Sequence, residues 1–91
     1  MRVYFKPSFI KDFKKLPYEI QREVRSICAE SFPKISHIRN FLTYEISPIK
    51  GFKDFFRIKV GEHRIGFKTT NGSRIEFMRV KHSKDIYKYF P

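Results

Sequence analysis

The sequence predicts one α+β domain over residues 1–91, in which two helices pack on one face of a mostly antiparallel sheet. The chain has 91 residues, which leaves room for a single small domain. Apolar residues recur at helical spacing in the first third of the chain, after a short β-rich run. From Gly51 onward, apolar and polar residues alternate with a period of two, which is typical of half-buried strands. We expect the face of the sheet opposite the helices to be open.

A strand and a helix begin the predicted fold. Residues 2–6 favour a strand, and Pro7 ends this run. Ser8 stands where a helix N-cap is expected, because its side-chain oxygen can accept a hydrogen bond from an unpaired N–H of the first turn. The residues that follow have apolar side chains at helical spacing, at Phe9, Phe13 and Leu16.

A second helix is predicted over residues 18–32. Pro17 suits its first turn, because proline fixes φ near the helical value, and Pro33 is expected to stop the helix. Between Lys34 and Lys50 the apolar positions have no sustained period, so we expect only a short helical turn that leads into a brief strand. The helix has one apolar stripe, which predicts that it packs on the sheet, formed by Ile20, Val24, Ile27 and Cys28.

Two hairpins are predicted to join three strands in the second half of the chain. The strands are expected over residues 55–60, 63–69 and 73–82. The dipeptides Gly61-Glu62 and Asn71-Gly72 lie at the connections and suit tight turns with positive φ. These signals indicate an antiparallel meander at the end of the sheet.

The last strand of the meander has an unusual apolar pattern. Its apolar residues are Ile75, Phe77, Met78 and Val80. Side chains alternate between the two faces of a strand, so these four cannot all point into one core, which indicates an interior strand with both faces partly covered. The segment that follows predicts a helical turn or a docked tail, held by Ile86, Tyr87 and Phe90.

Positive charge is the most informative bulk property of the chain. Twenty Lys and Arg residues against nine Asp and Glu give a formal net charge of +11. A polyanion or an acidic partner would neutralise this self-repulsion, and nucleic acid is the leading candidate. A hydrophobic content of 41% excludes a wholly disordered basic tail. The sequence has no run near the roughly 20 apolar residues that span a bilayer and no signal-like start, so we expect a cytoplasmic protein without a membrane partner.

We expect neither a metal ion nor a cofactor. Cys28 is the single cysteine, and the sequence contains no zinc-spaced Cys/His cluster. It also lacks a Gly-rich phosphate loop, a His-Glu-x-x-His motif and a closely spaced acidic pair in the meander. RNA can be cleaved without a metal, because its 2′-OH attacks the adjacent phosphodiester while side chains transfer two protons and cations stabilise the added negative charge.

Four cations are predicted to cluster on the open face of the sheet. Arg57 and Lys59 alternate with apolar residues in one strand, and Arg64 and Lys68 do so in the next. Like charges on neighbouring strands destabilise a sheet, which points to an anion such as phosphate between them. The alternative is a solvated basic face on which the long side chains spread apart.

The end of the last strand supplies a candidate for proton transfer. His82 is the titrating candidate near neutral pH, although a histidine in this position is more often a surface or packing residue. Tyr87 is alternatively part of the core, and His37 and His63 have weaker claims. We expect this segment to bring five residues near the basic face, namely Arg79, Lys81, His82, Lys84 and Tyr87.

Three segments resemble the RelE/ParE toxin superfamily, namely residues 3–17, 51–68 and 75–91. Together they cover essentially the whole chain, and the hairpin 57–67 followed by the ending 80–87 is the most specific part. The resemblance implies a RelE-like fold and the toxin of a type II toxin–antitoxin system. RelE-like members enter the ribosomal A site and cleave mRNA by the metal-free 2′-OH route, so the implied activity is that of an endoribonuclease, or mRNA interferase.

The resemblance also implies roles for individual residues. Arg57 and Lys59 match paired strand cations, of which one is a candidate base and both stabilise the phosphate. Arg64 resembles the arginine that stabilises the transition state, and Tyr87 matches an aromatic residue that orients or stacks on the target nucleotide. Five further cations are expected to bind RNA or the ribosome, namely Lys53, Lys68, Arg79, Lys81 and Lys84.

One position departs from the commonest pattern of the superfamily. Many relatives have Arg directly after the His, whereas this chain has Ser83. We interpret His82 as the general acid and keep Lys81 and Lys84 as alternatives, because a lysine ammonium can donate a proton.

The superfamily leaves other activities open. ParE-like members inhibit DNA gyrase without cutting RNA, so the fold does not decide the activity. A non-catalytic RNA-binding module would need the cations but no particular titrating group. The retained cations, His82 and Tyr87 favour RNA cleavage. The implied partners are the ribosome, mRNA and an acidic antitoxin in a hetero-oligomer, whose amphipathic helix lies along an apolar groove and blocks or distorts the basic site.

Overall fold

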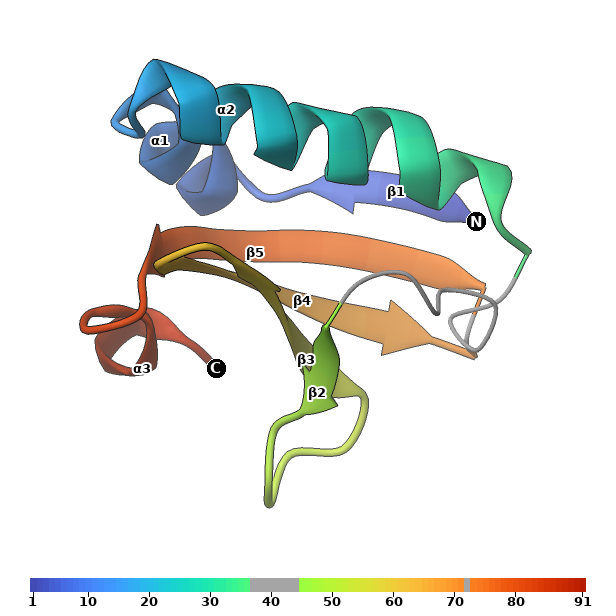
Figure 1. Ribbon diagram of the computed structural model, residues 1–91. Coiled ribbons are helices and arrows are strands. Elements are labelled where there is room, and N and C mark those ends of the chain that lie inside the picture. The colour runs from blue at the N-terminus through green and yellow to red at the C-terminus, as the bar shows by residue number, and fades with distance from the viewer. Residues whose placement is uncertain (37–44, 72) are drawn as a thin grey trace.

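The computed structural model describes residues 1–36, 45–71 and 73–91, and Figure 1 shows helices packed on one side of a twisted sheet. Within these described residues the sheet has five strands in the order β1-β5-β4-β3-β2, of which only β1 and β5 pair in parallel. The predicted mostly antiparallel α+β fold is therefore confirmed. The strands are β1 (Arg2–Phe5), β2 (Ile46–Pro48), β3 (Phe55–Val60), β4 (His63–Thr70) and β5 (Arg74–His82).

The helical layer consists of α1 (Pro7–Lys14) and α2 (Tyr18–Arg25), and α2 continues through π-helical η1 (Ser26–Ser31) and 3₁₀-helical η2 (Phe32–Lys34). Pro33 does not stop the helix as expected, because it lies in the first turn of η2, where a proline needs no N–H partner. The predicted stripe of the second helix does face the sheet, since Val24, Ile27 and Cys28 are buried there and Ile20 packs against them.

Ser8 is not the N-cap of α1, contrary to the sequence prediction. The helix begins at Pro7 and its N-cap is Lys6. The Ser8 hydroxyl instead donates a hydrogen bond of 2.7 Å to the carbonyl oxygen of Met78 in β5. Because Ser8 lies inside the first turn, its side chain points away from the helix axis toward β5, and this hydrogen bond attaches α1 to the sheet.

A β-bulge explains the apolar pattern of β5. Gly66 of β4 is opposite Arg79, but the next residue, Phe67, is opposite Phe77, so Met78 is an extra residue in β5. The bulge shifts the alternation by one position, and as a result the buried residues on both sides of it point to the same core, at Ile75, Phe77 and Val80. The expected interior position of this strand is confirmed, but its apolar pattern comes from the bulge.

The two tight turns have the predicted backbone geometry. Gly61 has φ of 57° and Asn71 has φ of 55°, as the Gly-Glu and Asn-Gly signals require, while Gly72 lies outside the described residues. The brief strand expected before Lys50 is present as β2, whereas the helical turn expected before it falls partly on residues 37–44, which are also outside the described residues.

The face opposite the helices is not fully open, because the end of the chain folds onto it. The predicted helical turn is α3 (Ile86–Tyr89), and both Ile86 and Phe90 are buried. Tyr87 does not dock as expected, since 55% of its surface is exposed. The Phe90 ring lies against Gly66, so closely that a Cβ atom at this position would be 2.6 Å from the ring.

The substitution Gly66→Ala should therefore displace Phe90. We expect the free energy of unfolding to fall by about 1–3 kcal/mol, the usual cost of overpacking, as measured by urea denaturation. Thr70→Ala changes an exposed position of the same strand and is the matched control. Equal stability of the Gly66→Ala variant and the control would show that Phe90 does not pack on Gly66.

Candidate functional site

The strand register gathers five cations on the face of the sheet opposite α1 and α2. Lys59 of β3 is opposite Arg64 of β4, which is in turn opposite Lys81 of β5. Strands lie about 4.8 Å apart, so these three side chains start from adjacent positions. Arg57 and Arg79 lie in the next row, on either side of Gly66. We call these five cations the cationic face, defined as Arg57, Lys59, Arg64, Arg79 and Lys81.

The predicted convergence of Arg57, Lys59 and Arg64 on one face is confirmed, but Lys68 is set apart from them. Lys68 shares their side of the sheet, but Phe90 covers Gly66, the position between Arg64 and Lys68. The Lys68 ammonium lies 5.5 Å from the centre of the Phe55 ring. Two other predicted cations, Lys53 before β3 and Lys84 after β5, are exposed in connecting segments.

Each cation from β3 and β4 has a partner of its own. The Arg57 guanidinium lies 5.5 Å from the centre of the Tyr87 ring, so Tyr87 adjoins the cationic face. Lys59 forms an ion pair of 3.9 Å with Glu45, and both side chains are largely exposed, so this pair is weak. One Arg64 nitrogen, Nη1, donates to the carbonyl oxygens of Gly61 and His63, each at 2.9 Å. The three cations therefore have different partners, which are a ring, a carboxylate and backbone carbonyls.

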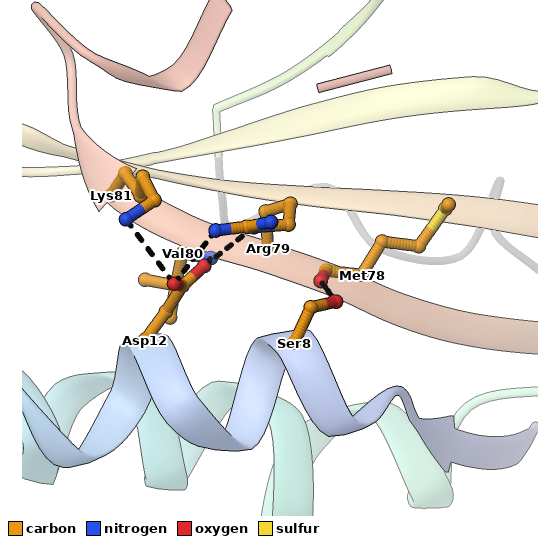
Figure 2. A network of polar contacts seen from close by, with 6 residues as sticks. All are labelled: Ser8, Asp12, Met78, Arg79, Val80 and Lys81. Atoms are coloured by element: carbon orange, nitrogen blue, oxygen red, sulfur yellow. Dashed lines mark hydrogen bonds and ion pairs between the residues drawn. The ribbon is translucent and has the colours of Figure 1, made fainter. Parts of the chain in front are cut away.

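Arg79 and Lys81, the two residues that β5 contributes to the cationic face, share one carboxylate, which the sequence analysis did not single out (Figure 2). Asp12 of α1 is only 5% exposed. It accepts hydrogen bonds from Arg79 Nε at 2.8 Å and Nη2 at 2.9 Å, and it lies 3.2 Å from Lys81 Nζ. A signal for this role was present in the sequence, because Asp12 is the only acidic residue before Glu19 and lies one helical turn after Ser8.

Asp12 and Ser8 form hydrogen bonds with backbone groups at the edge of β5. The pairing of β1 with β5 reaches only to Phe77, and beyond it α1 lies beside the strand. Ser8 binds the Met78 carbonyl, and Asp12 accepts a hydrogen bond of 3.2 Å from the Val80 N–H. Helix α1 therefore supplies the hydrogen bonds that another strand would otherwise make.

His82 is not in the row of the cationic face, although it lines one pocket at the end of β5 together with Lys81. Strand alternation directs it to the side of Val80, where its ring lies 5.5 Å from the ring of His63. Its Nδ1 accepts a hydrogen bond of 3.1 Å from the Lys84 N–H. Its neighbour Lys81 is the residue that the strand presents to Arg64.

His63 lies in a partly apolar environment at the end of the sheet, as its parity predicts. Its Nδ1 is buried and has no hydrogen-bond partner among the described residues. Burial lowers the pKa of His63 below its ordinary value, and the charges of His82 and Arg64 lower it further, while the nearby Glu62 acts in the opposite direction.

No group of three or more His, Cys, Asp and Glu residues in the described part of the chain could hold a metal ion. Within residues 1–36, 45–71 and 73–91, no helix is long and apolar enough to cross a membrane.

The lowered pKa of His63 predicts a pH dependence of stability. Above pH 6.5, the ordinary pKa of histidine, His63 is neutral in both the folded and the unfolded state. Below it the unfolded chain binds a proton that the folded chain does not, so the free energy of unfolding falls until the pH passes below the folded-state pKa. Urea denaturation between about pH 7.5 and 5 should show this loss, and His63→Gln should reduce it. An identical pH slope in both proteins would contradict the assignment.

The chain matches known proteins over nearly its whole length. Residues 3–87 match the family described as "ParE toxin of type II toxin-antitoxin system, parDE". Toxin RelE3 of Methanocaldococcus jannaschii is 42% identical over 91 residues, which are 100% of both chains.

Solved structures show the same fold. The toxin chain matched in the RelB-RelE antitoxin-toxin complex from Methanococcus jannaschii has a TM-score of 0.75 and 35% identity, covering 97% of this chain and 99% of that one. The archaeal RelE-RelB complex from Pyrococcus horikoshii OT3 has a TM-score of 0.61 and 20% identity, covering 89% and 92%, which is a likeness of fold alone. The chain therefore belongs to the RelE/ParE superfamily of toxins from type II toxin–antitoxin systems.

Proposed function

We propose that the protein is a ribosome-dependent endoribonuclease that cleaves mRNA in the A site without a metal ion. The observation that carries this proposal is the row of Lys59, Arg64 and Lys81 across three strands, flanked by Arg57 and Tyr87. Such a row suits an RNA phosphodiester, because cations on a rigid sheet stabilise the additional negative charge of the transition state.

The proposed reaction begins with attack of the ribose 2′-OH on its own phosphodiester. Lys59, once its ammonium has released a proton to solvent, accepts the proton of the 2′-OH, and Arg57 and Arg64 stabilise the pentacoordinate phosphorus. The bond to the 5′ oxygen then breaks, and a general acid protonates this leaving oxygen. The products are a 2′,3′-cyclic phosphate and a 5′-hydroxyl end. Tyr87, which is exposed beside Arg57, stacks on the target base.

Lys81 is the proposed general acid. His82 was the first choice from the sequence, but it is paired with His63 in the sheet and not with Arg64, and its ring lies beside that of His63. Lys81 is directly opposite Arg64, and its side chain is 21% exposed. Lys84 lies beyond the end of the strand.

The proposed protein partner is an acidic antitoxin, by analogy with the RelB-RelE complexes of the relatives. An apolar groove lies between β1, α1 and α2 and is suited to an amphipathic helix. It is on the helical side of the molecule, so a helix bound there would leave the cationic face for a second antitoxin segment to cover. Residues lining the groove include Phe5, Phe9, Ile10, Phe13 and Val24.

Induced expression followed by primer extension on reporter mRNAs tests the proposed activity. We expect cuts in phase with codons that require ribosomes, and fragments with 2′,3′-cyclic phosphate and 5′-hydroxyl ends. A DNA damage response with intact mRNA would instead support gyrase inhibition. Bound but uncut RNA would support a non-catalytic binding module.

Arg64→Ala should lower the cleavage rate by two or more orders of magnitude, about the loss seen when one transition-state donor is removed. Ribosome binding, measured by cosedimentation, should be largely retained. Lys14→Ala removes an exposed cation of α1 and is the matched control, for which we expect near-wild-type cleavage. A parallel loss of binding and cleavage in Arg64→Ala would rule out the proposed role of Arg64.

A further inference from the structure

The carboxylate of Asp12 contacts two cations and one backbone N–H. Its Oδ2 accepts hydrogen bonds from Arg79 Nε and the Val80 N–H, and its Oδ1 accepts one from Arg79 Nη2. A bidentate arginine already neutralises a buried carboxylate and fixes its orientation. The Val80 contact already satisfies the strand edge, so the ion pair with Lys81 is an addition to a complete structural unit.

Lys81 is held from two sides. Its ammonium lies 3.2 Å from Asp12 Oδ1 and 4.5 Å from the centre of the Tyr89 ring. Lysine has a flexible four-carbon chain, so an unrestrained ammonium at this position would sample many rotamers. The two contacts limit these rotamers, and the side chain keeps 21% exposure through which a substrate oxygen can approach.

Arg79 is as exposed as Lys81, at 22% against 21% of the side chain, but its contacts with Asp12 are different. Its guanidinium makes two hydrogen bonds to Asp12 and also lies 4.8 Å from the centre of the Tyr89 ring. Through these contacts Arg79 of β5 links α1 to α3. They also support an internal role for Arg79, in place of the RNA contact expected from the sequence.

We propose that Asp12 is a positioning residue that holds the ammonium of Lys81 at the end of the row formed with Lys59 and Arg64. This inference rests on the proposed nuclease function and deepens it, since it assigns a role to a helical residue outside the cationic face. Proton donation depends on geometry, and a displacement of about 1 Å at a reacting group can cost about 100-fold in rate.

The test uses single-turnover cleavage of ribosome-bound mRNA at increasing toxin concentration, which separates the maximal rate from the half-saturating concentration. Asp12→Asn keeps the size of the side chain and removes its charge. We expect a maximal rate lower by about 100-fold and a half-saturating concentration within about twofold of wild type. The matched control is Asp85→Asn, which breaks an exposed ion pair with Lys88 and should leave both quantities unchanged.

A double-mutant cycle separates positioning from a purely structural role. If Asp12 acts through Lys81, Asp12→Asn should lower the rate of the wild type but not the rate of Lys81→Met. A structural effect through Arg79 and Val80 would persist in both backgrounds, and that result would overturn the inference. A wild-type rate in folded Asp12→Asn would overturn it as well.

A second variant covers the case in which Asp12→Asn does not fold, and the activity of the wild-type protein separates failure of this inference from failure of the proposed function. If Asp12→Asn unfolds at the assay temperature, Asp12→Glu retains the charge for Arg79 but moves it by one methylene, and we expect a rate between those of wild type and Lys81→Met. A wild-type rate for a folded Glu variant would contradict the inference. Failure of the wild-type protein to cleave any mRNA would reject the proposed function itself, whereas normal cleavage by wild type and by Asp12→Asn rejects only the role of Asp12.

Discussion

Repulsion among positive side chains on one sheet face is the constraint around which this domain is organised. Three adjacent strands bring five cations together, and like charges in such positions destabilise a sheet. Partners from several elements offset this repulsion by contacting the cations. They include the Tyr87 ring, Glu45, the carbonyls of the β3–β4 turn and Asp12. The cations can therefore remain on one surface, because a ring, a carbonyl oxygen or a carboxylate lies against each charged end.

The nature of these partners divides four of the five cations into two groups, while Lys59 has an exposed ion pair with Glu45 and belongs to neither. Arg57 and Arg64 are held by an aromatic ring and by neutral carbonyls, which an anionic phosphate can replace with stronger, charge-assisted contacts. Arg79 and Lys81 are instead held by a nearly buried carboxylate. Arg57 and Arg64 are therefore suited to turn toward a bound substrate. Arg79 and Lys81 are suited to keep their positions while the substrate binds.

Sequence reasoning succeeded where the period-two pattern was uninterrupted. In β3 and β4, alternation alone placed Arg57, Lys59 and Arg64 on one face, because turn geometry then fixed their register. It was less reliable in β5, where the bulge at Met78 breaks the alternation of the apolar residues. His82 lies after the bulge, and the regular alternation of residues 79–82 sets it apart from Arg79 and Lys81.

Long-range contacts were also beyond the reach of local patterns. The hydrogen bonds of Asp12 join residues 67 or more positions apart in the chain, and no local periodicity encodes such a pairing. The docking of Phe90 on Gly66 is another such contact, since it depends on the absence of a side chain in a distant strand. In both cases the residue types were visible in the sequence, but their partners came only from the tertiary fold.

Helix α1 connects the two sides of the molecule. Its Phe9 and Phe13 line the apolar groove, and Asp12 on the same helix reaches the cations of β5. The most direct test of the central claim is a cryo-EM structure of the protein on a ribosome whose A-site mRNA carries 2′-O-methyl groups, which block the attacking oxygen. We predict that Arg57, Lys59 and Arg64 surround the scissile phosphate. A complex in which the α1–α2 side faces the mRNA and the cationic face points away from it would contradict the claim.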